Sequence, residues 1–423
     1  MEFSEFGRFF SADSGIFRLM DDIDAALSSP GQMHLLGGGN PAHIPEVQEA
    51  FRNTMHRILA DGKHFERMIG NYDGCQGNTE FIAALADLLQ RKFGWDVGPA
   101  NIAVTNGSQS SFFVLFNLFA GRFSDGGYRK VLLPLTPEYI GYGGAGLGQQ
   151  LFTALRPAIE CRSDHEFKYR VDFEGLVIGP EVGALAMSRP TNPTGNVLTD
   201  EEIAQLRALA AANDLPFILD AAYGSPFPNI VFAEATPTWD QSTIFCLSLS
   251  KLGLPGLRTG IVVANESVIR AVAGSNAILS LAPGSAGPVL VTEMLRDGSM
   301  LQISDRLIRP YYERRAKEAV GWLESALGDY PWRVHTPEGA IFLWLWFEDL
   351  PISSETLYQR LKQRGVLVIS GEHFFPGLED DWEHRHQCIR ISYGQDPATV
   401  QAGIEIIAEE IRGAYGSAAA KIA

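Results

Sequence analysis

The segment Ile244–Gly260, with the sequence IFCLSLSKLGLPGLRTG, decides how the rest of this chain is interpreted. Its apolar beginning predicts a buried strand that ends near Lys251, and a loop rich in Gly and Pro then leads past Arg258 to a second apolar run, Ile261–Ala264. An amine at the end of a buried strand loses hydration, so its pKa falls and it becomes available as a nucleophile. An isolated lysine in this position more often extends its ammonium to solvent, so the neighbouring segments must decide between these interpretations.

Short apolar runs alternate with helical patterns through the first part of the chain. This alternation favours an α/β fold, in which a mostly parallel sheet lies between helices and ligands bind beyond the carboxyl ends of the strands. The predicted strands before the Lys251 segment are Ile102–Thr105, Lys130–Leu133, Gly183–Met187 and Pro216–Asp220. The polar groups that should therefore emerge at one edge of the sheet are Gly107–Gln109, Tyr139, Asn192, Asp220 and Lys251.

The loop Asn106–Gln109 separates a predicted strand from the helical run Ser110–Ala120. Free N–H groups and the helix dipole at such a helix start favour an anion such as phosphate. Any strand-to-helix turn can carry Gly and Ser, so an ordinary turn remains the alternative. Tyr139 and Tyr142 lie in a further loop, where an aromatic ring could stack on a flat ligand.

From Pro283 onward, longer helical patterns, notably Ile303–Leu327, and new apolar strands indicate a second, smaller α+β lobe. Arg390 lies within one of these strands, Cys388–Ser392, with an isoleucine on each side. Strand alternation turns its side chain away from both neighbours, and an inward-facing guanidinium needs an anion. Its planar fork matches a carboxylate, so a ligand carboxylate and a structural salt bridge are equal alternatives here.

Composition and charge narrow the class of protein. The chain has 423 residues, 46% of them hydrophobic, which is typical of a soluble globular protein with two lobes. A net charge of -16 and a pI near 5.0 argue against binding to nucleic acid or to an anionic membrane. We find no signal peptide and no apolar run as long as a membrane span. Four scattered cysteines without CxxC spacing favour reduced, buried thiols in a cytoplasmic protein.

Three histidines near the end of the chain, His373, His384 and His386, raise the question of a metal site. They lie among acidic residues in a polar segment, a pattern that is more typical of a solvated loop than of metal ligands. We therefore expect no metal and look for an organic cofactor instead.

The candidate groups together match one cofactor and its substrate. A buried amine suits a carbonyl, a helix start suits a phosphate, a strand-end carboxylate suits a ring nitrogen, and an arginine suits a carboxylate. Pyridoxal phosphate and an amino acid carry all of these groups between them. The carboxylate of Asp220 would keep the pyridine nitrogen protonated, which strengthens the ring as an electron sink.

Seven segments spread along the chain support this hypothesis. They are GNYDGCQGN, TNGSQSSFF, PEYIGY, SRPTNPTGN, DAAYG, SLSKLGLPGLRTG and CIRISYG. In their order and spacing they resemble the class I aminotransferases of PLP fold type I, and the resemblance covers most of the chain. A second set of segments together resembles the bacterial valine–pyruvate branch of this family more than its aspartate or aromatic branches, namely GGGNPAHIPE, NYDGCQGNTE, SLSKLGLPG, PEGAIFLWLWF and FFPGL.

The resemblance implies an α/β fold with two domains. The large domain, residues 46–295, would hold a mostly parallel, seven-stranded sheet between helices. The small α+β domain would consist of residues 1–45 and 296–423, and its N-terminal segment around Ile16 and Phe17 would close over the active site. The resemblance also implies a homodimer with two shared active sites.

A role for each polar group at the sheet edge follows from the same resemblance. Lys251 would bind the cofactor aldehyde and later move a proton at the substrate α-carbon, and Asp220 would pair with the pyridine nitrogen. Asn192 and Tyr223 would hydrogen-bond the phenolic oxygen, while Tyr139 would stack on the ring. The residues expected around the phosphate are Gly107, Ser108, Gln109, Ser248, Arg258 and, from the second subunit, Tyr72.

Substrate contacts are implied as well. Arg390 would bind the α-carboxylate, with Asn192 and the backbone around Gly39 assisting. No second arginine matches the one that aspartate aminotransferases use for a side-chain carboxylate, so we expect an apolar side-chain pocket. Arg258 follows the lysine one residue sooner than in many family members, so the loop between them must differ.

These features imply an aminotransferase that works by ping-pong half-reactions, with valine or a similar apolar amino acid as donor and pyruvate as acceptor. Another reaction of the same cofactor, such as that of a β-lyase or racemase, is an alternative because the early chemical steps are shared. A ligand-binding regulator is a further alternative, although it would need a basic DNA-binding module for which this acidic sequence offers no segment. The expected partners are small amino acids and 2-oxo acids, without nucleic acid or membrane.

Overall fold

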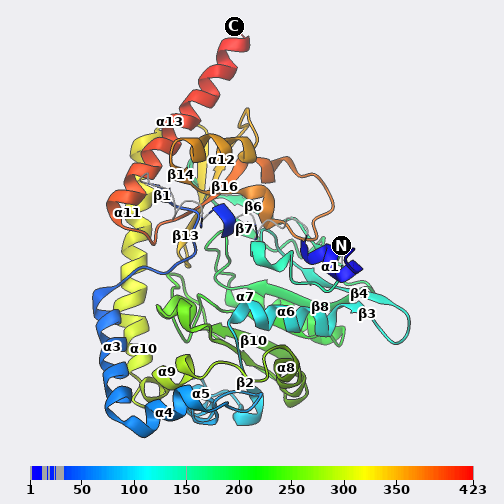
Figure 1. The fold of residues 1–423 in the computed structure, drawn as a ribbon. Coiled ribbons are helices and arrows are strands. Elements are labelled where there is room, and N and C mark those ends of the chain that lie inside the picture. The colour runs from blue at the N-terminus through cyan, green and yellow to red at the C-terminus, as the bar shows by residue number, and fades with distance from the viewer. Residues whose placement is uncertain are drawn as a thin grey trace.

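The computed structural model describes residues 2–11, 17, 20–22, 24, 33–148 and 150–422, which form two lobes (Figure 1). The larger lobe is built around an eight-stranded sheet and the smaller around a six-stranded sheet. Helices along one side of the molecule connect the lobes, with α3 (Pro45–Ala60) lying beside the column formed by α10 (Ser299–Ile303) and α11 (Arg309–Leu327).

The sheet of the large lobe has the strand order β2-β11-β10-β9-β8-β4-β3, and β5 also pairs with β4. The pairs from β10 through β9, β8 and β4 to β5 are parallel, whereas β11 is antiparallel to both neighbours and β3 to β4. The strands are β2 (Ile102–Thr105), β3 (Gly121–Arg122), β4 (Tyr128–Leu133), β5 (Phe152–Ala154), β8 (Val182–Ser188), β9 (Phe217–Asp220), β10 (Thr243–Ser248) and β11 (Gly260–Val263). The expected mostly parallel sheet is confirmed, and the two-residue β3 is an addition to the seven strands expected.

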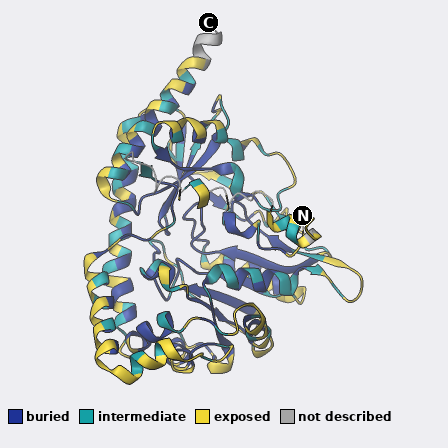
Figure 2. Ribbon diagram, in the orientation of Figure 1, coloured by how far each residue is buried: buried dark blue, intermediate teal, exposed yellow. Residues whose placement is uncertain are grey.

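Helices cover both faces of this sheet, so its central strands are buried along their whole length (Figure 2). Side chains alternate between the faces: along β10, Phe245 and Leu247 belong to one core and Cys246 to the other. Thr199 and Glu202 form a capping box that begins α7. The helices of this lobe are α4 (Gly62–Gly70), α5 (Thr79–Phe93), α6 (Ser108–Phe119), α7 (Asp200–Ala212), α8 (Glu266–Leu279) and α9 (Ala286–Arg296).

The sheet of the small lobe has the order β15-β16-β13-β12-β7-β6. Its strands are β6 (Ala158–Cys161), β7 (Glu166–Arg170), β12 (Trp332–His335), β13 (Phe342–Phe347), β15 (Ile369–Ser370) and β16 (Cys388–Ser392), and its helices include α12 (Ser354–Gln363) and α13 (Pro397–Ile422). The hairpin of β6 and β7 comes from the middle of the chain and joins this sheet through β12. Residues 158–170 therefore extend the small-lobe sheet, although they fall within the range 46–295 expected for the large domain.

The predicted long helix Ile303–Leu327 is not a single α-helix. Residues Ser304–Ile308 form a π-helical turn between α10 and α11. Pro310 stands in the first turn of α11, where it has no N–H to continue the α-helical ladder from the preceding turn, and a local change of hydrogen-bond spacing accommodates it.

The segment that begins at His34 is attached to the small lobe, whereas the ring of Phe10 in α1 (Glu5–Ser11) lies 6.3 Å from the Phe113 ring of the large-lobe helix α6. Strand β1 (His34–Leu35) pairs in parallel with β14 (Val366–Leu367), and this pairing carries Gly37–Gly39 towards the space between the lobes. Helix α1 precedes β1 in the chain. Ile16, which we expected to close over the active site, lies outside the described residues.

The four cysteines differ in exposure. Cys246 and Cys388 lie on central strands and are buried as predicted, but Cys75 and Cys161 are exposed. The expectation of buried thiols is wrong for these two, because one lies in a surface loop and the other at the end of the edge strand β6.

The histidine segment is also less solvated than predicted. His384 stacks on Trp382 with ring centres 4.5 Å apart, and burial lowers the pKa of His384 to about 3. His386 instead forms ion pairs with Asp381 and Glu372. The described residues contain no group of three His, Cys, Asp or Glu side chains arranged to hold a metal. Within the same ranges, no helix is both long and apolar enough to cross a membrane.

Candidate active site

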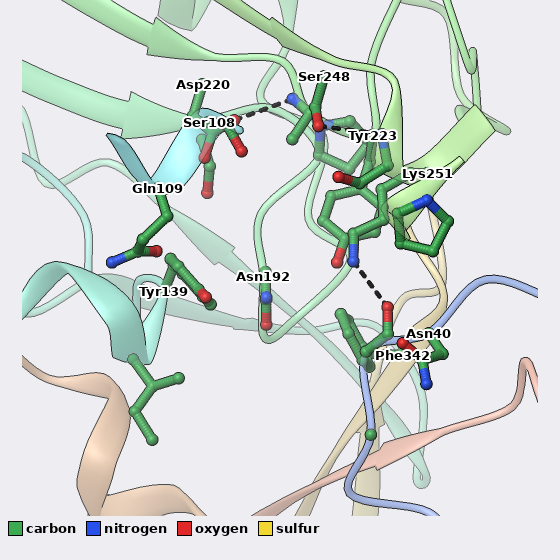
Figure 3. A pocket seen from close by; sticks show the side chains of 18 of the residues that line it. Asn40, Ser108, Gln109, Tyr139, Asn192, Asp220, Tyr223, Ser248, Lys251 and Phe342 are labelled. Atoms are coloured by element: carbon green, nitrogen blue, oxygen red, sulfur yellow. Dashed lines mark hydrogen bonds between the residues drawn. The ribbon is translucent and has the colours of Figure 1, made fainter. Parts of the chain in front are cut away.

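A pocket of about 310 Å³ lies between the lobes, beyond the carboxyl ends of β8, β9 and β10 (Figure 3). This is the edge at which the sequence predicted that polar groups would meet. The predicted site residues that line the pocket are Gly39, Ser108, Gln109, Tyr139, Asn192, Asp220, Tyr223, Ser248, Lys251, Arg258 and Arg390. Gly107 lies directly against the Arg258 side chain, and Tyr72 does not line the pocket of its own chain.

Lys251 follows β10 by three residues and lies in a short 3-10 helix. Its Nζ donates a 2.6 Å hydrogen bond to the carbonyl oxygen of Gly39 and lies 5.3 Å from the centre of the Tyr223 ring. Desolvation, aided by the positive charges of Arg390 and Arg258, lowers the pKa of Lys251 to about 8. Among the described residues, no carboxylate is in ion-pair contact with Nζ. The site therefore holds an amine that loses its proton easily.

Asp220 ends β9, so its carboxylate reaches the pocket from the carboxyl edge of the sheet. Oδ2 accepts a 2.8 Å hydrogen bond from the Tyr142 hydroxyl, and Oδ1 accepts one of 2.9 Å from the backbone N–H of Ala222. Burial raises the pKa of Asp220 to about 6, although these hydrogen bonds and the charge of Lys251 oppose the rise. The sequence indicated Tyr142 only as a ring that could stack on a ligand, and its spacing gave no sign that the hydroxyl holds Asp220.

The start of α6 packs tightly against Arg258. Gly107 has a φ of 89°, and a Cβ at this residue would lie 2.3 Å from the guanidinium of Arg258. A Cβ at Gly260 would lie 2.5 Å from the backbone nitrogen of Ser108. The positive φ at Gly107 and the close backbone at Gly260 both favour glycine, and the absence of a side chain leaves room for the guanidinium beside the start of α6. A cation beside the N–H groups of a helix start is suited to phosphate.

Arg390 is only 2% exposed on β16. Two of its guanidinium nitrogens donate hydrogen bonds of 2.7 Å each, one to Oδ1 of Asn192 and one to the carbonyl oxygen of Gly37. Its Nε has no hydrogen-bond partner among the described residues, and its guanidinium lies 3.9 Å from the centre of the Phe342 ring. Burial lowers the pKa of Arg390 to about 10. No carboxylate of the described residues neutralises this cation, so the structural salt bridge is absent there and a ligand carboxylate is the remaining alternative.

Much of the remaining lining is apolar, with Leu35, Ile140 and Phe342 prominent. The charged side chains that line the pocket, among the described residues, are Asp220, Lys251, Arg258 and Arg390. Sequence reasoning missed Phe342, because the run FLWLWF has the pattern of a buried core strand. That strand is indeed core, but its first residue also faces the pocket.

Comparison with known proteins identifies the family. Residues 148–407 match the family model of class I and II aminotransferases. The chain therefore belongs to this family of enzymes, and its two lobes have the fold of PLP fold type I, as predicted.

The similarity extends over whole chains. The sequence is 52% identical to the valine–pyruvate aminotransferase of Escherichia coli K12, over 98% of this chain and 99% of that protein. The crystal structure of the valine–pyruvate aminotransferase from Salmonella typhimurium LT2 has a TM-score of 0.88 at 50% identity, over 95% of this chain and 99% of that one. A putative amino-acid aminotransferase from Psychrobacter arcticum reaches a TM-score of 0.96 at 48% identity, over 98% and 99% of the two chains.

Proposed function

We propose that this aminotransferase uses pyridoxal phosphate to transfer the amino group of L-valine, or of a similar apolar amino acid, to pyruvate. The products would be 3-methyl-2-oxobutanoate and alanine, formed in two ping-pong half-reactions. The observation that carries the proposal is that one pocket contains an amine, Lys251, and a guanidinium, Arg390, neither of which is in ion-pair contact with a carboxylate of the described residues. The names of the two valine–pyruvate aminotransferases it resembles support the choice of substrates.

The groups around the pocket fit pyridoxal phosphate. Lys251 would bind its aldehyde carbon, Asp220 would pair with its ring nitrogen, and Tyr139 would lie against its ring. Asn192 and Tyr223 would bind its phenolic oxygen. The residues proposed for the phosphate are Gly107, Ser108, Gln109, Ser248 and Arg258. The bound cofactor supplies an electron sink that stabilises negative charge at the substrate α-carbon.

The chain itself supplies binding, orientation and proton transfer. The Arg390 fork, whose Nε has no partner among the described residues, would bind the substrate α-carboxylate, and Asn192 and the Gly39 backbone would orient the same end of the substrate. This orients the α-carbon towards Lys251. Because the pKa of Lys251 is lowered to about 8, its amine can accept the α-proton near neutral pH and return it afterwards.

The choice of an apolar donor rests on the charges in the pocket. A substrate with a side-chain carboxylate would need a second cation, and no further lysine or arginine lines the pocket within the described ranges. Burying such a carboxylate against Leu35 or Ile140 would cost several kcal/mol, on the order of the penalty for an unpaired buried charge. Valine places only methyl groups there.

We further propose a cytoplasmic homodimer whose two sites are shared. The Tyr72 side chain is 82% exposed and outside its own pocket, which suits a residue that completes the phosphate site of the second subunit. Mixing Tyr72→Ala subunits with Lys251→Ala subunits should then restore part of the activity, because one site of each mixed dimer is intact.

We also propose that the chain divides into two domains. The large domain is residues 46–295, and the small domain is residues 1–45 with 296–423, to which the β6–β7 hairpin is attached.

A visible absorption spectrum tests the proposed reaction. The purified protein should show a yellow band from the bound cofactor that bleaches with L-valine and returns with pyruvate, whereas L-aspartate should leave it unchanged. A band that ignores valine but responds to aspartate would refute the substrate assignment. No band after addition of pyridoxal phosphate would refute the cofactor assignment.

A further inference from the structure

Glu138 is a second buried carboxyl group close to the pocket, and nothing in the proposed reaction uses it. It is fully buried, immediately before Tyr139. Its Oε1 accepts a 2.7 Å hydrogen bond from the backbone N–H of Ser188, and its Oε2 lies 2.5 Å from the Ser188 hydroxyl oxygen. Its own backbone N–H donates a 2.8 Å hydrogen bond to the carbonyl oxygen of Phe374. Glu138 thus joins three segments, namely the loop after β4, the end of β8 and the small lobe.

Among the residues that the structure describes, no cation compensates the carboxyl group of Glu138. Within the described residues, its side-chain hydrogen bonds come from Ser188 and from the backbone N–H of Tyr139, and no lysine, arginine or histidine is in ion-pair contact with it. The titratable groups whose charges reach it are Asp220 on β9 and Tyr142 in the loop after β4. The charge of Asp220 disfavours a second negative charge nearby.

Asp220 carries a negative charge more readily than Glu138. Both carboxyl groups accept hydrogen bonds, but within the described residues only Asp220 has a nearby cation, Lys251, whose charge favours its ionised form. Two interacting carboxyl groups in one buried site do not ionise independently, so the better-supported group takes the charge and the other keeps its proton.

We propose that Glu138 is a positioning residue that remains a neutral carboxylic acid, holds Tyr139 and Ser188 in place, and leaves Asp220 as the single ionised carboxylate beside the pocket. Burial raises the pKa of Glu138 to about 8, in keeping with this assignment. Ser188 lines the pocket and is paired in register with Asp220. A protonated Oε2 can donate to the Ser188 oxygen, which frees the serine hydroxyl to donate into the pocket.

The proposal predicts how stability changes with pH. The pKa of Glu138 is raised in the folded protein to about 8 from an ordinary value near 4.5. Its contribution to stability is therefore complete below about pH 4.5 and is lost as the pH rises towards 8. Glu138→Gln keeps the shape of the neutral side chain but cannot ionise. The variant should therefore not lose this contribution to stability as the pH rises from about 4.5 towards 8.

The experiment compares urea unfolding of the cofactor-saturated wild type and Glu138→Gln at a fixed protein concentration between pH 5 and 9. The unfolding constant of the wild type, divided by that of the variant, should rise by up to about tenfold per pH unit between pH 5 and 8 and then level off. Glu201→Gln, an exposed helix position, serves as the matched control and should give a flat ratio. A flat ratio for Glu138→Gln would overturn the proposal.

Infrared spectroscopy gives a second measurement if Glu138→Gln does not fold. The wild-type protein at pH 7.5 should show the carbonyl stretch of an un-ionised carboxylic acid, and this band should disappear as the pH rises above 8. Absence of the band at pH 7.5 would overturn the proposal. The role given to Asp220 rests on the proposed function, whereas both measurements report on Glu138 even if the cofactor assignment fails.

Discussion

Two lysines with buried surroundings, Lys251 in the pocket and Lys168 on β7, have opposite environments. Lys168 is 2% exposed, forms a very close ion pair with Glu338, and donates a 3.0 Å hydrogen bond to the carbonyl oxygen of Val197. Burial lowers the pKa of Lys168, and the charge of Glu338 opposes this effect. Lys251 donates to one neutral acceptor, the carbonyl oxygen of Gly39. Burial and the charges of Arg390 and Arg258 lower the pKa of Lys251, and the charge of Asp220, which is not in ion-pair contact with it, opposes them.

The comparison teaches that burial alone does not make a lysine reactive. Both ammonium groups lose hydration, but only Lys168 has a carboxylate in contact that holds its proton and its position. Lys168 connects β7 to Val197 by a hydrogen bond and to Glu338 by an ion pair, and the Val197 N–H also donates to Glu338. Lys251 lacks such a partner among the described residues and faces a pocket, so its amine is available for chemistry.

The largest effect should follow from removing the pocket amine. Lys251→Ala should abolish the yellow band and reduce turnover by at least about 10⁴-fold, because both the covalent link and the proton carrier are lost. Absorption spectra and a coupled alanine-formation assay measure the two effects. Lys168→Met, assayed where it is folded, should keep the band. If Lys168→Met lost the yellow band and Lys251→Ala kept it, Lys168 rather than Lys251 would be the reactive lysine.

Removing the buried amine of Lys168 should mainly affect the stability of the fold. Lys168→Met leaves the Glu338 carboxylate buried without its close partner, which should cost about 3 kcal/mol of unfolding free energy. Arg162, 3.8 Å from the other carboxylate oxygen, limits the loss. The double variant Lys168→Met with Glu338→Gln should cost less than the sum of the single variants.

Denaturant unfolding measures these differences, and an exposed ion pair provides the control. Lys317→Met removes the partner of Glu313 on a helix surface where the lysine side chain is 74% exposed. It should change stability by less than about 1 kcal/mol. Additive costs for the two Lys168 and Glu338 variants would show that the buried pair does not act as a unit.

A smaller effect is expected at the second cation of the pocket. Arg390→Lys keeps the charge but loses the planar fork, so the KM for valine should rise about 30- to 100-fold, which corresponds to about 2–3 kcal/mol. The kcat should fall less, since Lys251 is unchanged. Steady-state kinetics with varied valine measure the two constants. Arg364→Lys, at a surface pair with Glu409, is the control and should leave both unchanged. An unchanged KM in Arg390→Lys would contradict the role in carboxylate binding.

The smallest effect concerns pH. Only an unprotonated amine can react with an aldehyde. The pKa of Lys251 in the cofactor-free protein is lowered to about 8, so its unprotonated fraction grows with pH up to about that value. The rate of pyridoxal phosphate uptake should rise by about tenfold per pH unit below pH 8 and level off above it. Stopped-flow absorbance measures this rate. A rate that keeps rising to pH 10 would mean that the amine has the pKa of an ordinary exposed lysine.

The sequence predicted which polar residues meet at the sheet edge where those residues follow strands directly. Asp220 and Lys251 come at or just after the ends of buried strands, so the parallel sheet brings them to one edge whatever the details of packing. Strand alternation predicted that the Arg390 side chain faces away from its two isoleucine neighbours, but it left a ligand carboxylate and a structural salt bridge as equal alternatives. The mostly parallel sheet followed in the same way from alternating strands and helices.

Other features depend on contacts between distant residues and could not be predicted. Tyr142 holds Asp220, although the two are 78 positions apart in the chain. The pairing of β7 with β12 joins Glu166 to Val334, which are far apart in the chain, and periodicity does not show which sheet a hairpin joins. Glu138 follows a proline in an unremarkable loop, and its importance comes from burial, which the sequence does not show.

The glycine segment between the lobes has a mechanical consequence. The carbonyl of Gly37 accepts from Arg390 and the carbonyl of Gly39 accepts from Lys251, so one short piece of backbone holds both cations. Two residues of chain span at most about 7 Å, so the two carbonyl groups cannot move further apart than this. A large displacement of Arg390 away from Lys251 therefore requires at least one of these two hydrogen bonds to break.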